Sequence, residues 1–215
     1  MTTAEAHDLF LEAVLAGNRR TAFGVIDRAL DAGMDLRALY LEVFQPALRE
    51  VGRRWELNLI TVADEHLATA ITQAAMARLY DRLFSSASLG GRLLLAACAD
   101  NERHEVGLRM ICDILEMEGW DTVFLGATVP LDDLVRMVRD RRPDVVALSA
   151  SIAPHLPRVR EAVRVIREEV PEPPLIAVGG RPFVEDPGLA LRVGADLTAP
   201  DAAAAAERLK EWFEG

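Results

Sequence analysis

The sequence predicts an α/β protein in which an N-terminal four-helix bundle is followed by a flavodoxin-like, doubly wound five-stranded parallel sheet. Two observations support this prediction. Residues 1–87 carry apolar side chains at the three- and four-residue spacing of amphipathic helices, and they show no strand pattern. From residue 91 onward, short apolar runs alternate with helical segments, which is typical of a parallel sheet with helices on both faces. We therefore expect two domains, at 1–87 and 91–215.

The bundle is expected to contain four helices, at 4–16, 18–32, 35–57 and 62–86. In the second of these, Ala22, Val25, Ile26 and Ala29 recur at helical spacing, so one face is apolar. In the third, Pro46 predicts a kink, because proline has no N–H to donate within a helix. The short connections favour antiparallel neighbours.

The elements of the second domain follow a linker at 85–91, where the residues are small, polar and glycine-rich. Strands are expected at 92–98, 121–126, 144–149, 174–178 and 195–198, and helices at 105–118, 131–141, 156–169, 186–193 and 201–213. A strand that is followed by a helix and then by another strand returns parallel to the first, so we expect an all-parallel sheet.

Composition excludes several classes of function. The formal net charge of −10 argues against direct binding to nucleic acid or to an anionic membrane. Lys210 is the only lysine, which excludes a P-loop, a Schiff base and the conserved lysine of a receiver domain. Cys98 and Cys112 form no C-x-x-C motif, and we expect both to be buried. We see no signal peptide and no apolar run long enough to span a membrane, so we expect a cytoplasmic protein.

The candidate functional residues follow the predicted strands, at the sheet edge where open α/β sheets bind ligands. The strand-end segments are Asp100–Gly107, Ser149–Ser151, Gly179–Gly180 and Thr198–Pro200. A receiver domain is excluded because no aspartate ends the third strand, and a dinucleotide site is excluded because no G-x-G-x-x-G follows the first strand. Serine- and glycine-rich loops can bind a phosphate, so a flavodoxin-like phosphate site remains an alternative. That interpretation does not explain Glu102 and His104, whose spacing suits a metal-binding histidine oriented by a carboxylate.

These segments resemble the cobalamin-binding signature D-x-H-x-x-G, S-x-L and G-G. Between Gly107 and Ser149 there are 41 residues, and between Ser151 and Gly179 there are 27, which are spacings of the size found in that family. The resemblance implies that His104 is the lower axial ligand of cobalt. It further implies that the cofactor is contacted by Glu102, Arg103, Gly107, Ser149, Ser151, Gly179 and Gly180. Two positions depart from the pattern, since Glu102 replaces the usual aspartate and Ser151 the usual leucine.

The predicted bundle carries a second motif, Trp55 followed after nine residues by Glu65 and His66. It resembles the W-x9-E-H motif of the light-sensing adenosylcobalamin photoreceptors of the CarH/LitR type, which also place a four-helix bundle before a cobalamin domain. The resemblance implies that these three residues contact the upper, adenosyl side of the cofactor. Glu56 stands where better-known members have a histidine that captures cobalt after photolysis. That role then falls to His66 or another histidine, of which His7 and His155 are less suited, or a water takes the position.

The resemblance implies a stand-alone cobalamin-binding photosensor rather than an enzyme, with adenosylcobalamin as cofactor and with a bilin as an optional second pigment. With no DNA-binding segment expected, it would act through self-association or a protein partner. The alternative is the corrinoid carrier of a methyltransferase system. Carriers usually read D-x-H-D-I-G-K-N, whereas this chain continues Gly107-Leu108-Arg109. A mutase subunit ranks third, because the barrel that holds a substrate radical is missing from this sequence.

Overall fold

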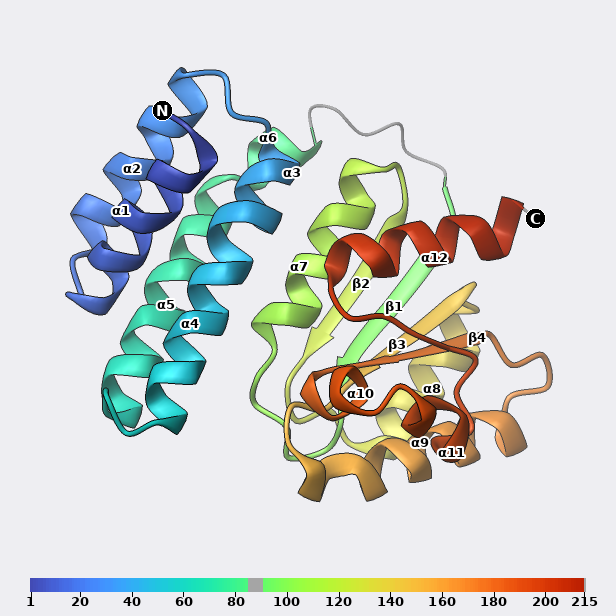
Figure 1. Ribbon diagram of the computed structural model, residues 1–215. Helices are drawn as coiled ribbons and strands as arrows, with labels where there is room; N and C mark the ends of the chain where they lie inside the picture. Colours follow the sequence, from blue (N-terminus) through green and yellow to red (C-terminus); the bar gives the residue numbers. More distant parts are fainter. Residues whose placement is uncertain (85–90, 215) are drawn as a thin grey trace. The chain divides into compact units, whose positions relative to one another are not determined.

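The structure is a computed structural model that describes residues 1–84 and 91–214. The chain divides into two compact units, Met1–Ser86 and Ala87–Gly215, and the predicted linker lies outside the described residues except for Gly91. The first unit is helical and the second is an α/β sheet (Figure 1), which confirms the predicted fold class.

The first unit is built from α1 (Thr3–Leu15), α2 (Arg19–Asp31), α4 (Gln45–Glu56) and α5 (Val62–Arg78). Helix α1 packs against α2, α4 and α5, and α5 also contacts α2 and α4. The aromatic rings of Phe10, Tyr40 and Phe44 meet in the core, where the centroids of Phe10 and Phe44 lie 5.1 Å apart. Thr2 and Thr61 begin α1 and α5 with capping boxes, as side-chain acceptors for the first N–H groups.

Two of the predicted bundle helices are interrupted. The third consists of α3 (Leu36–Ala38), a π-helical segment (Leu39–Phe44) and α4. Its wider turn precedes Pro46, whose missing N–H and bulky ring do not fit a regular α-helical turn. The fourth ends at Arg78, and the short helix α6 (Tyr80–Phe84) follows after a break at Leu79.

The second unit contains a sheet of β1 (Leu93–Cys98), β2 (Asp121–Gly126), β3 (Val145–Ser149), β4 (Leu175–Gly179) and β5 (Leu197–Thr198). All strand pairs are parallel and the order is β2-β1-β3-β4-β5, which is the flavodoxin-like order. In the ladders, Ser149 pairs with Cys98 on one side and with Gly179 on the other. The first, third and fourth strands therefore end together.

Helices cover both faces of the sheet (Figure 1). Helices α7 (Val106–Met117) and α12 (Ala202–Glu214) pack together on one face. The other face is covered by α8 (Leu131–Arg141), α9 (Leu156–Glu169) and α11 (Gly188–Val193). The short helix α10 (Arg181–Glu185) was not predicted and begins directly after Gly180. Strand β5 is shorter than the predicted 195–198.

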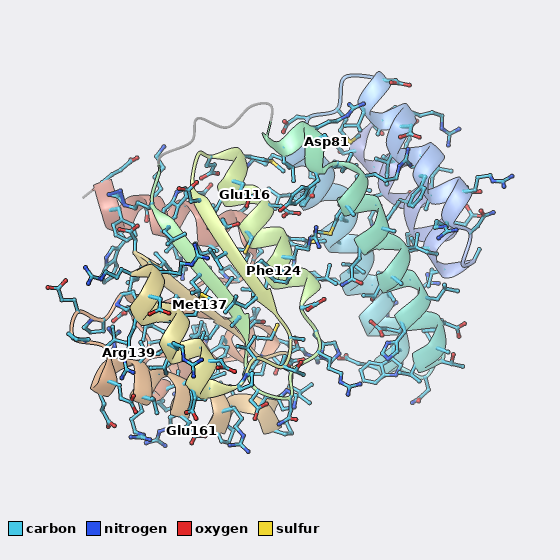
Figure 2. All side chains as sticks on the ribbon, turned by 180° about the vertical axis from the view of Figure 1, so that it is seen from behind. Asp81, Glu116, Phe124, Met137, Arg139 and Glu161 are labelled. Atoms are coloured by element: carbon cyan, nitrogen blue, oxygen red, sulfur yellow. The ribbon has the colours of Figure 1, made fainter. Side chains whose placement is uncertain are left out.

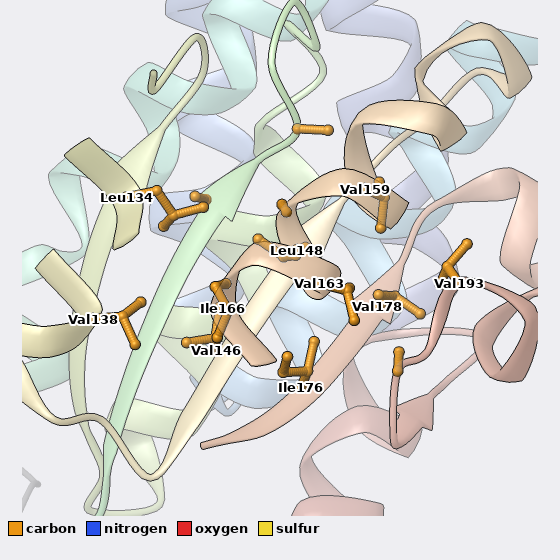
Figure 3. Close-up of a cluster of buried hydrophobic side chains, with 14 of the residues drawn as sticks. Leu134, Val138, Val146, Leu148, Val159, Val163, Ile166, Ile176, Val178 and Val193 are labelled. Atoms are coloured by element: carbon orange, nitrogen blue, oxygen red, sulfur yellow. The ribbon is translucent and has the colours of Figure 1, made fainter. Parts of the chain in front are cut away.

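At the carboxyl ends of β3 and β4, the two faces of the sheet differ in side-chain size. Large apolar residues of β3 and β4, among them Leu148 and Val178, point into the core beneath α8 and α9 (Figure 3). Because side chains alternate along a strand, Ser149 and Gly179 belong to the α7–α12 face. On the α8–α9 face, Arg139 donates to Glu169 at 2.7 Å and ties these two helices together (Figure 2).

Among the described residues, no helix is both long and apolar enough to cross a bilayer.

Candidate functional site

The loop between β1 and α7 places its residues by main-chain hydrogen bonds. The N–H of Ala99 donates to the Ser149 oxygen at 2.9 Å, and the N–H of Glu102 turns back to the Ala99 oxygen at 2.8 Å. Asn101 takes a left-handed conformation with φ 69°, which asparagine tolerates better than most residues. This tight turn directs Glu102 inward and leaves His104 near the surface.

Glu102 is the centre of the site. It is 0% exposed, yet its carboxylate accepts four hydrogen bonds. Oε1 accepts from the main-chain N–H of His104 at 2.8 Å and from Nδ1 of the same residue at 2.5 Å. Oε2 accepts from the N–H of Ser151 at 2.6 Å and from Nδ1 of His155 at 3.0 Å. One carboxylate therefore joins the loop after β1 to the segment after β3.

These contacts settle the charge of Glu102. Burial by itself raises the pKa of a carboxyl group, but the hydrogen bonds from His104, His155 and Ser151 outweigh it and hold the pKa of Glu102 below its usual value. An ionised carboxylate only accepts hydrogen bonds, so we assign the protons that face it to Nδ1 of both histidines. In the neutral form of the His104 ring, a proton on Nδ1 leaves the lone pair on Nε2, and this is the tautomer that can bind a metal through Nε2.

His104 presents this ring to the outside, with 49% of its side chain exposed. In the described parts of the chain, no group of three or more histidine, cysteine or acidic side chains is arranged to hold a metal ion. A single histidine suits a metal that arrives with most of its ligands already in place. The central cobalt of a corrinoid is such a metal.

Two of the predicted glycines leave room for a bulky group. At Gly107 and Gly179, a Cβ atom would meet nothing within 4 Å. Gly180 differs, because its φ of 106° and a Cβ only 2.0 Å from the Ala150 oxygen make glycine a requirement of the backbone. Ser149 is buried beside Gly179 in the ladder. The pair of His104 and Glu102 and the space beside Gly107 and Gly179 therefore fit a corrinoid.

Two other side chains of the loop have different roles. Arg103 is exposed, and no hydrogen bond or ion pair of its side chain with another described residue assigns it a function. Glu105 accepts from the N–H of Ala127 at 3.0 Å and fastens the loop to the end of β2. Burial, together with the charges of Glu102 and Glu105, raises the pKa of Cys98 to about 12, so this thiol is not a nucleophile at neutral pH.

The second predicted constellation lies in the helical unit. Trp55 lies in the last turn of α4 and is 40% exposed, while Glu65 and His66 lie in the first turns of α5. Glu65 accepts from Nδ1 of His66 at 2.5 Å and from the hydroxyl of Thr69 at 2.9 Å. Exposed apolar side chains surround the connection between the two helices, namely Leu57, Leu59, Val62 and Leu67.

Sequence reasoning did not predict the contact between His155 and Glu102. It treated this residue only as a poor candidate for capturing cobalt, whereas its ring donates to Glu102 across 53 positions of sequence. A cavity of about 290 Å³ was also not anticipated; it lies on the α8–α9 side, between the end of β1, the β2–α8 loop and α9. None of the predicted site residues lines it, so we do not assign it to the His104 site.

Comparison with known proteins decides the family. A family model described as "B12 binding domain" matches residues 92–210, and a second model with the same description matches residues 6–80. Together these matches cover both units of the structure.

The chain belongs to the B12 binding domain family.

Relatives within this B12 binding domain family fall into two groups. The HTH-type transcriptional repressor CarH of Myxococcus xanthus is 34% identical over 170 residues, which cover 79% of this chain and 56% of the relative. The dimethylamine corrinoid protein of Methanosarcina barkeri is 22% identical over 98% of this chain and 99% of its own length. The chain spans about half the length of the Myxococcus relatives that it matches, 56% of CarH and 42% of CarA.

Among solved structures, the monomethylamine corrinoid protein of Methanosarcina barkeri has a TM-score of 0.85 at 21% identity, over 98% of this chain and 100% of that one. At this identity the likeness shows a shared fold. Membership of the B12 binding domain family implies a cobalamin or related corrinoid cofactor. The histidine, carboxylate and glycines of the His104 site are compatible with one.

Proposed function

We propose that this B12-binding protein is an adenosylcobalamin-based light sensor, with His104 as the lower axial ligand of cobalt. The observation that carries the proposal is the Trp55, Glu65 and His66 constellation, which is not the bundle motif of corrinoid carriers. Its residues occupy one end of the α4–α5 pair, and exposed apolar side chains adjoin them. Such a surface suits the apolar and hydrogen-bonding parts of an adenosyl group.

The roles of the residues follow from their contacts. His104 would ligate through Nε2, while Glu102 orients its ring. Gly107, Ser149 and Gly179 would leave space for the nucleotide tail, with Gly180, Ser151 and Arg103 at its edge. In the helical unit, Trp55 would pack on the adenosyl group, and Glu65 and His66 would hydrogen-bond to it.

Bound adenosylcobalamin supplies a cobalt–carbon bond that visible light breaks. Loss of the upper group would remove the ligand of Trp55, Glu65 and His66, and thereby alter the surface that the helical unit presents. We propose that this change is transmitted through self-association or through a protein partner. No motif or contact among the described residues argues for a bilin, so the proposal is confined to the corrinoid.

The second candidate function is that of a corrinoid carrier for a methyltransferase. It is favoured by the dimethylamine corrinoid protein, which matches nearly the whole chain from end to end. The sequence after Gly107 departs from the usual carrier pattern, and identity to CarH is higher over the shared part. These two observations are our reasons for proposing the sensor ahead of the carrier.

The deciding experiment compares dark and illuminated protein. The chain is loaded with adenosylcobalamin in the dark, and absorption spectra and gel-filtration volumes are recorded before and after green light. A sensor is expected to change both its absorption spectrum and its elution volume after illumination. The same protein loaded with methylcobalamin serves as the comparison. An elution volume that light leaves unchanged, combined with methyl transfer to a corrinoid-dependent methyltransferase, would establish the carrier instead.

Variants test the two sides of the cofactor separately. His104→Ala is expected to abolish the spectrum of histidine-ligated cobalamin, while His7→Ala, which changes a histidine of α1, leaves it intact. Trp55→Ala is expected to weaken adenosylcobalamin more than methylcobalamin. Trp212→Ala is the matched control, because this tryptophan of α12 is also exposed, at 55%. Equal losses of both cobalamins in Trp55→Ala would remove the adenosyl site from the proposal.

A further inference from the structure

Glu102 is shared by two histidines that come from different segments of the chain. His104 belongs to the loop after β1 and contacts Oε1, while His155 belongs to the 3-10 turn Ala153–His155 after β3 and contacts Oε2. The resemblance to the cobalamin signature accounts for His104 and Glu102 but assigns nothing to His155. A second imidazole on a fully buried carboxylate therefore needs its own explanation.

The position of His155 is well defined. Pro154 and Pro157 flank it and restrict the backbone on both sides, and its N–H donates to the Ile152 oxygen at 3.1 Å. Its side chain is only 18% exposed. A ring that is held this firmly, with Nδ1 directed at a carboxylate oxygen, is placed to act on that carboxylate.

Hydrogen bonds to one carboxylate compete for the same negative charge. Each donor stabilises the ionised form and makes the oxygens weaker bases. Without His155, Oε2 would keep only the Ser151 N–H, and three donors would remain on the group. Those three donors still hold Glu102 in place. With one donor fewer, the carboxylate becomes a stronger acceptor for the Nδ1 proton of His104.

We propose that His155 is a positioning residue that holds Oε2 of Glu102 and limits how strongly Oε1 draws the Nδ1 proton of His104. The inference rests on the proposed function insofar as His104 is the cobalt ligand. The donor strength of Nε2 depends on how far that proton is shifted toward the carboxylate. His155 thus tunes the lower ligand through Glu102.

The test uses the cofactor-free protein, labelled with 15N, and records the ring nitrogen shifts of His104 at one neutral pH. His104→Ala identifies its resonances. His155→Leu fills the space but offers no donor, so the Nδ1 resonance of His104 is expected to move toward the value of an unprotonated ring nitrogen. His155→Asn keeps an N–H at the position of Nδ1 and is expected to restore the wild-type shift, and His7→Ala is expected to leave it unchanged.

Two results would overturn the inference. One is a lower melting temperature in His155→Leu with unchanged His104 shifts, which is the mark of a residue that only supports the fold. The other is a His155→Asn variant that behaves like His155→Leu. If His155→Leu does not fold, His155→Gln serves in its place, because its amide nitrogen lies one bond farther along the side chain. His155→Gln is expected to shift the Nδ1 resonance as His155→Leu would, and an unchanged resonance would count against the inference.

The NMR readout needs no bound cobalamin, so it is separate from the test of the proposed function. The proposed function fails if the cobalamin spectrum of the His104→Ala protein is unaltered. The further inference fails only through the His104 shifts of the His155 variants.

Discussion

Replacing Glu102 by glutamine tests the carboxylate at the centre of the site. Each carboxylate oxygen accepts from one main-chain N–H and one histidine Nδ1. An amide has a single acceptor oxygen, so its NH2 group must face one of these two pairs. The histidine of that pair can change tautomer and accept, but the main-chain N–H of His104 or Ser151 cannot.

The expected loss of stability follows from this count. One buried N–H without an acceptor destabilises the fold by about 1–3 kcal/mol, and the remaining bonds lose the contribution of the charge, so the free energy of unfolding should fall by about 2–5 kcal/mol. Urea unfolding of the cofactor-free protein, followed by circular dichroism, measures it. Glu185→Gln is the control, because Glu185 is exposed and contacts Arg181 at 2.7 Å; its change should stay within about 0.5 kcal/mol. If Glu102→Gln lost no more than this control, the four-donor description would be refuted.

Three further predictions concern the rest of the chain. Gly180→Ala should lower the urea midpoint strongly, because φ at this residue is 106° and a Cβ would lie 2.0 Å from a main-chain oxygen. The control Gly52→Ala, in open space on α4, should raise the free energy of unfolding by about 0.5–1 kcal/mol. Equal effects of the two substitutions would contradict backbone strain at Gly180. Burial raises the pKa of Cys98 to about 12 and that of Cys112 further, so neither thiol should react with iodoacetamide at pH 8 in the native protein, and rapid labelling would argue against their burial. Burial also raises the pKa of Glu116, so its carboxyl group binds a proton more tightly in the native state than in the unfolded state. The stability that this group contributes therefore increases as pH falls through its native pKa. Glu116→Gln should therefore stabilise the protein at pH 7 and remove that gain on acidification; a loss of stability at pH 7 would show that the charged form is favoured.

The architecture was predictable from sequence because it depends on periodic burial. The runs around Leu95, Val146 and Ile176 are apolar on both faces, as strands covered by helices on both sides must be, and the helices between them dictated a parallel sheet. The apolar run that ends at Cys98 placed Glu102 and His104 in the loop after the first strand. Their direct contact in the structure agrees with that placement.

Other features depended on contacts that a linear pattern does not contain. The π-helical segment before Pro46 arises from how one proline fits its own helix, and spacing alone predicted only a kink. Helix α10 is too short to show a periodicity. The bond between His155 and Glu102 joins residues from two loops, and nothing in the sequence around His155 distinguishes it from a surface histidine. Such tertiary pairs become visible only once the strands are in register.

The unequal faces of the sheet bear on how this protein can change over evolutionary time or in the laboratory. At the carboxyl ends of β3 and β4, the bulky residues Leu148 and Val178 point away from the face that carries Ser149 and Gly179. Substitutions that repack the α8–α9 side can therefore alter thermal tolerance while the side chains of the candidate site stay unchanged. On the opposite side, where Leu94 and Val145 are also buried, substitutions confined to the strand ends can alter the candidate site with less effect on the core. A library confined to one side at a time would exploit this independence.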